Sequence, residues 1–121
     1  MVNKIPDPSE IKNLADEIKQ FLIDRHMWED TRIYFNGVAY DSEAEEVLPD
    51  MDPHAYTEYA GDFLTMTFEG PLYDALNNGP WSTEEKLQDI FSKYGLYYEM
   101  GHAWDLSAYP LFQKPEEEDD P

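Results

Sequence analysis

The chain has 121 residues, about the size of one domain, and carries 27 Asp and Glu residues against 8 Lys and Arg, a formal net charge of −19 at pH 7. Hydrophobic residues make up 41% of it, and because a chain of this length buries roughly two thirds of its unfolded surface on folding, the charge does not indicate a disordered protein. The charge argues against nucleic acid or an anionic membrane as a direct ligand, and the lack of cysteine excludes disulfides, zinc–thiolate sites and a thiol nucleophile.

A helix is predicted first in chain order, over about residues 8–25. The segment Asp7-Pro8-Ser9-Glu10 supplies a side-chain acceptor, a proline and a glutamate at the spacing of a capping box. Apolar residues then recur at helical spacing and form one stripe for the core, namely Ile11, Leu14, Ala15, Ile18 and Leu22.

A tight β-hairpin is predicted next, between residues 32–35 and 38–40. Asn36-Gly37 separates these runs, and a type I′ turn needs two residues that tolerate positive φ. A two-residue loop places four apolar side chains on the core face, namely Ile33, Phe35, Val38 and Tyr40. Tyr34 and Ala39 should then point to the opposite face.

Residues 41–60 form a long acidic connection. Pro49 and Pro53 interrupt regular structure, although residues 45–48 are compatible with a short strand. A connection of this length is unusual within one domain, so we expect it to be either functional or mobile.

The second half of the chain supplies three strands and two helices. Residues 63–69 alternate as a strand, with Leu64, Met66 and Phe68 facing the core and the threonines between them facing outward. A short helix over residues 72–76 is expected, and then a longer helix that starts at a Ser82 capping box and ends before Gly95. A final hairpin joins residues 96–100 and 103–109 through Gly101-His102, with its register left open.

Together these elements predict an α+β fold: a single antiparallel sheet of about five strands with two main helices plus one short helix packed on one face, in the order α-β-β-β-α-α-β-β. We expect one domain over residues 1–114. Residues 115–121 are a strongly acidic tail without apolar side chains, which we expect to be disordered and dispensable for folding.

The sequence lacks the features of membrane and exported proteins. No apolar run approaches the ~18–20 residues of a membrane span. The first residues also lack the apolar stretch of a signal peptide. We therefore expect a cytoplasmic protein with no membrane partner.

No catalytic motif and no cofactor-binding motif is present, so we expect no enzyme activity and no cofactor. The three histidines, His26, His54 and His102, are isolated in sequence, and a shared metal site or catalytic triad would depend on the fold. Asp50 and Asp52 could bind a divalent cation, but the segment lacks the spacing of a calcium loop, so we predict no dedicated metal site.

The charge is concentrated in the middle of the chain. Residues 33–85 contain twelve acids and no Lys or Arg. This favours a non-enzymatic acidic protein that engages a basic protein surface, with a nucleic-acid-binding protein as the natural partner, because spaced carboxylates imitate the regular charge of DNA. Nucleic-acid-mimicking inhibitors and immunity proteins against nuclease toxins are of this class. The expected partner-binding residues are Asp41, Glu43, Glu45, Glu46, Asp50, Asp52, Glu58, Tyr56 and Tyr59, since exposed tyrosines often anchor protein contacts.

Other functions stay open on the sequence alone. An acidic surface also aids solubility, so a cytosolic domain of unrelated function is the main alternative, and a small enzyme is the next. Adaptation to high salt is disfavoured by the Ile, Phe and Tyr content and by the lysines of the first helix. The acids of a binding protein should gather on one face beside aromatic side chains, whereas those of a merely soluble surface should be spread out.

Overall fold

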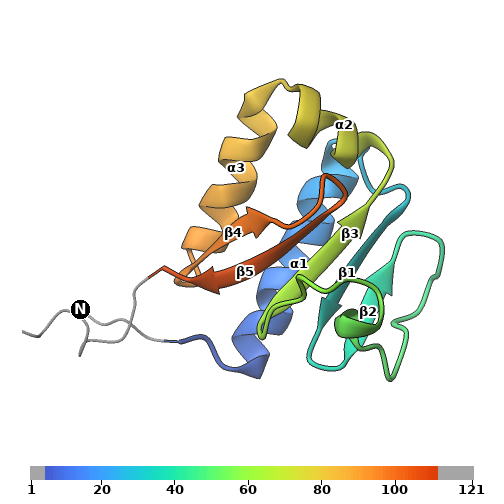
Figure 1. Cartoon of the computed structure of the whole chain (residues 1–121), viewed down its shortest axis with the longest axis vertical. Coiled ribbons are helices and arrows are strands. Elements are labelled where there is room, and N and C mark those ends of the chain that lie inside the picture. The colour runs from blue at the N-terminus through green and yellow to red at the C-terminus, as the bar shows by residue number, and fades with distance from the viewer. Residues whose placement is uncertain (1–4, 112–121) are drawn as a thin grey trace, which may run out of the picture.

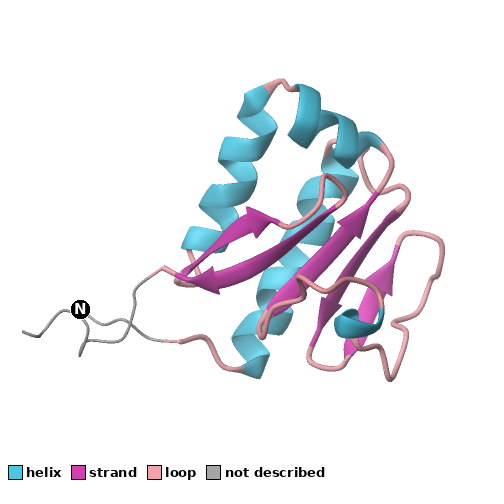
Figure 2. Cartoon of the chain, viewed as in Figure 1, coloured by secondary structure: helices cyan, strands magenta, loops and turns pink. Residues whose placement is uncertain are grey.

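Three helices pack on one face of a five-stranded antiparallel sheet in the computed structural model, which describes residues 5–111 (Figure 1, Figure 2). The elements in chain order are α1 (Pro8–Asp24), β1 (Thr31–Phe35), β2 (Val38–Asp41), the short 3-10 helix η1 (Pro53–Ala55), β3 (Leu64–Phe68), α2 (Pro71–Asn78), α3 (Trp81–Ser92), β4 (Leu96–Met100) and β5 (Asp105–Pro110). The strand order across the sheet is β2-β1-β3-β5-β4. This confirms the predicted fold class and element order, whereas the predicted tail at 115–121 lies outside the described residues.

The core lies between the helices and the inner face of the sheet. Helix α1 begins at the predicted capping box, in which the Asp7 carboxylate accepts from the Glu10 backbone and the Glu10 carboxylate accepts from the Asp7 backbone. Its apolar stripe is buried as expected and meets strand residues such as Ile33, Met66 and Leu106. None of the helices within the described residues is long and apolar enough to cross a membrane.

The first hairpin has the register predicted from Asn36-Gly37. Phe35 pairs with Val38 and Ile33 pairs with Tyr40, and all four side chains belong to the core or pack against it. Asn36 and Gly37 take φ values of 51° and 82°, in the left-handed region that the turn requires.

Two local predictions in the second half were wrong. Helix α3 starts at Trp81 after an extended Pro80, so Ser82 lies inside the first turn and makes no cap. The last hairpin turns through residues 101–104, wider than the predicted Gly101-His102 turn, and pairs Tyr98 with Ala108. The wider turn is stabilised by Asp105, whose carboxylate accepts from the His102 backbone N–H.

The outer edge of β4 is covered by one side chain of α3. The Gln88 side-chain amide donates to the Tyr98 carbonyl at 3.0 Å and accepts from the Tyr98 N–H at 3.1 Å, so it takes the place of a neighbouring strand. A free strand edge is a template for unwanted pairing, so this contact protects the sheet as well as stabilising it.

Replacing Gln88 with Met should therefore lower the free energy of unfolding by about 1–2 kcal/mol, because two backbone groups lose their partner while the side-chain size is kept. Urea denaturation of the Gln88→Met variant measures the loss. Gln20→Met is the matched control, since the Gln20 side chain bonds only the exposed Asp24 carboxylate. Equal stability of the two variants would contradict the edge-covering role.

Candidate functional site

Residues 42–62 run beside the free edge of β2 and then cross the face of the sheet opposite the helices, where η1 lies in front of the strands and α1 behind them (Figure 1). Side-chain hydrogen bonds fasten both ends of this segment, which we call the crossing segment. At its start the Thr31 N–H donates to the Ser42 hydroxyl at 3.1 Å. The Thr57 hydroxyl donates to the Asp105 carboxylate at 2.7 Å, and the Ser107 hydroxyl donates to the Tyr59 carbonyl at 2.9 Å. The Gly61 N–H donates to the Thr65 hydroxyl at 3.0 Å.

The cover explains why outward-facing sheet residues are buried. Tyr34 and Thr65 point away from the helical core as predicted, yet they are only 2% and 0% exposed. Ala39 is also buried, because it forms an isolated antiparallel bridge with Leu48 of the crossing segment. The short strand considered for residues 45–48 is reduced to this single bridge within the described structure.

Asp105 is the central anchor of the crossing segment and is 1% exposed. Its carboxylate accepts from the Thr57 hydroxyl and from the His102 backbone N–H, and it lies 2.7 Å from His102 Nδ1. Burial alone would raise the pKa of Asp105, but the hydrogen bonds from His102 and Thr57 outweigh it and hold that pKa below its usual range. The carboxylate is therefore ionised and fully engaged at neutral pH.

His102 joins this anchor to the aromatic side chains around it. Its ring stacks on Trp104 with centroids 4.5 Å apart, and the Tyr59 ring meets it edge-on at 4.8 Å. The Glu58 carboxylate lies 4.0 Å from His102 Nε2. The Thr57 hydroxyl donates to Asp105 and not to the imidazole, so the geometry does not activate it as a nucleophile; the cluster fastens the crossing segment.

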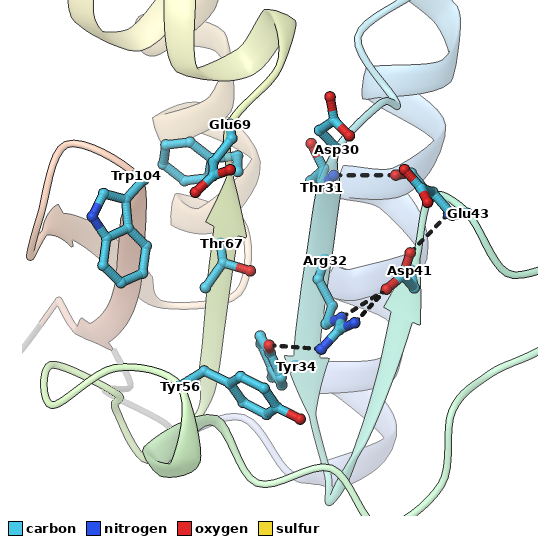
Figure 3. Close-up of a pocket in the computed structure, with 12 residues that line it drawn as sticks. Asp30, Thr31, Arg32, Tyr34, Asp41, Glu43, Tyr56, Thr67, Glu69 and Trp104 are labelled. Carbon is cyan, nitrogen blue, oxygen red and sulfur yellow. Dashed lines mark hydrogen bonds and ion pairs between the residues drawn. The ribbon is translucent and has the colours of Figure 1, made fainter.

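An open groove of about 450 Å³ lies on this face beside the crossing segment. Its floor comes from the outward side chains of β1 and β3, including Arg32, Tyr34 and Thr67. Figure 3 shows Trp104 and Tyr56 on one side, Asp41 and Glu43 on the other, and Asp30 with Glu69 at one end. We call this the acidic groove.

Arg32 is the basic residue of the acidic groove, and it is already engaged. Its guanidinium donates to Asp41 Oδ2 from Nε at 2.8 Å, with Nη2 at 2.7 Å from the same oxygen, and Nη1 donates to the Tyr34 hydroxyl at 3.2 Å (Figure 3). The same group lies 5.4 Å from the centroid of the Tyr56 ring. One carboxylate and two tyrosines therefore surround one guanidinium.

The other three carboxylates of the acidic groove keep their charge uncompensated. Within residues 5–111, neither Asp30, Glu43 nor Glu69 forms an ion pair with a basic side chain. With Asp41 neutralised by Arg32, the groove has a net negative charge and aromatic walls.

A second hollow of about 320 Å³ adjoins the acidic groove, because Tyr34 lines both. It is bordered by Asp52 and Asp62 of the crossing segment and by the first hairpin turn. The two hollows therefore make one uneven acidic surface across this face.

The expected partner-binding residues are distributed unevenly over this surface. Asp41, Glu43 and Tyr56 line the acidic groove, and Asp52 lines the second hollow. Glu58 and Tyr59 contact His102 instead. Three further acids are exposed but line neither hollow, namely Glu45, Glu46 and Asp50.

Sequence reasoning missed three residues of the acidic groove, Asp30, Glu69 and Trp104. They come from the chain just before β1, just after β3 and just before β5. Backbone hydrogen bonds bring them together, since the Glu69 N–H donates to the Asp30 carbonyl at 3.0 Å and the Phe68 N–H donates to the Trp104 carbonyl at 2.8 Å. The missing information was the pairing of β3 with β1 on one side and with β5 on the other.

The histidines are held apart in separate contacts. His54 lies 3.0 Å from the exposed Asp52 carboxylate, and His102 belongs to the Asp105 anchor. Over residues 5–111 no group of three or more His, Asp or Glu side chains is arranged to hold a metal ion.

No protein-family model, curated protein or solved structure matches the chain.

Proposed function

We propose that the protein is a cytoplasmic, non-enzymatic acidic binding protein that imitates nucleic acid and thereby occupies a basic surface of a nucleic-acid-binding protein, as an inhibitor or immunity-type protein does. The observation that carries the proposal is the acidic groove, where three carboxylates that have no Lys or Arg partner among residues 5–111 lie beside aromatic side chains on the face away from the helices.

Charge complementarity supports a basic partner. Among the acids of residues 41–58, only Asp41 pairs with a Lys or Arg side chain within the described residues, while Asp52 and Glu58 lie near histidines. Most of the negative charge of this segment is therefore open to an approaching protein. Such a surface steers a basic partner into contact and raises the association rate.

The aromatic side chains supply contacts that charge alone does not. Tyr56 is 50% exposed and Tyr59 is 46% exposed, although each packs one side of its ring against the fold. Half-exposed tyrosines held in a fixed position are typical anchors of protein interfaces. They support a binding role for this face over an acidic surface that serves solubility alone.

Hydrogen bonds hold the crossing segment against the sheet, and this also suits a binding surface. Its anchors at Thr57, Tyr59 and Gly61 hold the carboxylates in place before a partner arrives. A preorganised surface loses less conformational entropy on binding than a flexible loop of the same charge.

A pull-down with the full chain from its native host, at low and high salt, tests the proposal. A partner should be retained at low salt, released by salt and displaced by duplex DNA. We expect its association rate to fall by about tenfold or more when five acids are neutralised together to Gln or Asn. These are Glu43, Glu45, Glu46, Asp50 and Asp52.

The matched control removes the same number of charges from exposed positions outside the crossing segment. It replaces Asp24, Glu84, Glu85, Asp89 and Glu99 with Asn or Gln. Association should change much less in this variant. A partner whose binding ignores salt, duplex DNA and the five-fold neutralisation would contradict nucleic-acid mimicry and leave solubility as the reason for the charge.

A further inference from the structure

The two ends of the acidic groove differ in charge. At one end the Arg32 guanidinium lies against the Asp41 carboxylate and near the rings of Tyr34 and Tyr56. The other end also has two carboxylates and a large aromatic ring, at Asp30, Glu69 and Trp104. No Lys or Arg side chain of residues 5–111 forms an ion pair with these two carboxylates. We call these three residues the acidic corner.

Backbone contacts fix the acidic corner. The Glu69 N–H donates to the Asp30 carbonyl, and the Phe68 N–H donates to the Trp104 carbonyl. The approach is so close that a Cβ on Gly70 would lie 2.8 Å from the Glu29 carbonyl oxygen. The two carboxylates and the indole are thus built on the ends of β1 and β3 and on the turn before β5.

The indole of Trp104 has one face already covered. It stacks on His102 with an angle of 3° between the rings, and the side chain also lines the acidic groove (Figure 3). The face of an indole attracts cations more strongly than any other side-chain ring does. A planar guanidinium combines this stacking with forked hydrogen bonds to carboxylates, which an ammonium group cannot do.

We propose that the acidic corner binds the guanidinium of an arginine side chain from the basic partner, stacked on Trp104 and hydrogen-bonded to Glu69, with the charge of Asp30 adding to the attraction at the same end of the groove (Figure 3). This inference rests on the proposed function and names the part of the partner that the acidic groove recognises. Arg32 with Asp41 and the tyrosines is the same chemistry within the chain itself.

Titration calorimetry of the full chain with hexa-arginine amide and hexa-lysine amide at low salt tests the proposal. We expect hexa-arginine to bind more tightly. The double variant Asp30→Asn/Glu69→Gln should weaken hexa-arginine binding by about tenfold, because the charge-assisted hydrogen bonds to Glu69 and the negative charge of Asp30 are lost. Asn also tolerates the positive φ of 51° at position 30, so this change should leave the turn intact.

The matched control is Glu45→Gln/Glu46→Gln, which removes the same charge from exposed positions outside the acidic groove. Hexa-arginine binding should weaken much less in this variant. A second readout is the indole N–H signal of Trp104 in NMR spectra, which should shift on addition of N-acetyl-arginine amide while those of Trp28 and Trp81 stay in place.

The outcomes separate this inference from the proposed function. Equal losses in the two double variants would mean diffuse attraction, which overturns the arginine site and leaves the acidic surface as proposed. If hexa-lysine bound the wild type as tightly as hexa-arginine, and lost as much affinity in the Asp30→Asn/Glu69→Gln variant, the site would not select a guanidinium group. Absence of any hexa-arginine binding would overturn the site outright, whereas nucleic-acid mimicry is decided separately by displacement with duplex DNA.

Discussion

Truncation of Phe91 to Ala should lower the free energy of unfolding by about 3–5 kcal/mol, since it removes a large buried side chain and leaves a cavity. Phe91 lies on α3, is 0% exposed and packs against the Tyr98 ring of β4 with centroids 5.2 Å apart. It therefore joins a helix to the outermost strand. Urea denaturation followed by far-ultraviolet circular dichroism measures the loss.

Phe21→Ala is the matched control for this change. Phe21 lies on α1 but is only partly buried, with the Arg25 guanidinium 4.8 Å from its ring centroid. Removal of the same group should cost clearly less there, because less apolar surface is returned to water. A cost below ~1 kcal/mol for Phe91→Ala would contradict the packing of α3 on the sheet.

The helical layer could be predicted because its signals are periodic and local. The stripe of α1, the alternation of β3 and the Asn36-Gly37 turn each lie within a few residues of the structure that they specify. Each pattern also agrees with its neighbours, so the core faces of α1, the first hairpin and β3 were predicted correctly.

The second face of the sheet could not be predicted in the same way. Thr65 and Ser107 look like solvent-facing residues of alternating strands, but they are buried because the crossing segment covers them. That cover depends on single polar contacts between residues more than forty positions apart, such as Thr57 with Asp105. Polar pairs of this kind have no period and leave no local pattern.

Only part of the candidate site could be predicted from the sequence, for the same reason. The acids of residues 41–58 stand out by their density, so Asp41 and Glu43 were found. Asp30 and Glu69 look like ordinary residues at strand ends, and only the pairing of Thr31 with Phe68 places them side by side. Pairing between strands that are not joined by a hairpin is a property of the whole fold.

Replacement of Asp105 by Ala should lower the free energy of unfolding by about 3 kcal/mol at neutral pH, because hydrogen bonds to a charged group are lost and their donors are left behind. The donors are the Thr57 hydroxyl and the His102 backbone N–H, in a site that is almost fully buried. Asp105→Asn keeps an acceptor oxygen and the side-chain shape, so it should cost less. Urea denaturation of both variants gives the difference.

Lowering the pH should remove the stabilisation that the ionised Asp105 carboxylate gives the wild-type protein. The pKa of Asp105 is lower in the folded than in the unfolded chain, so its stabilisation is complete above the ordinary aspartate pKa of about 3.9 and is lost as the pH falls through the lower folded value. The difference in stability between wild type and Asp105→Asn should therefore be largest near neutral pH and should decrease steadily as the pH falls below about 4. A difference independent of pH would contradict an ionised anchor.

Replacement of Asp105 by Ala should also loosen the crossing segment on the face that we propose for binding. With Asp105 removed, Thr57 loses its tie to β5, and the amides of Tyr59 and Gly61 should exchange their hydrogens faster, since their acceptors are the hydroxyls of Thr57 and Thr65. Amides in α1 should keep their protection relative to global unfolding. This comparison separates a local release of the crossing segment from a general loss of stability.

Gly101→Ala offers a second route to the same release. A Cβ at position 101 would collide with Asp105 Oδ1 and lie 2.6 Å from the Cβ of Tyr59, so either the anchor or the crossing segment must move. Binding of the basic partner should then be weaker in both Asp105→Ala and Gly101→Ala, while the helical layer stays folded. The reason is that the carboxylates of the crossing segment would no longer be held in place. If the segment exchanges its amides at the wild-type rate in both variants, then Asp105 does not hold it, and preorganisation of the acidic surface must come from its other contacts with the sheet.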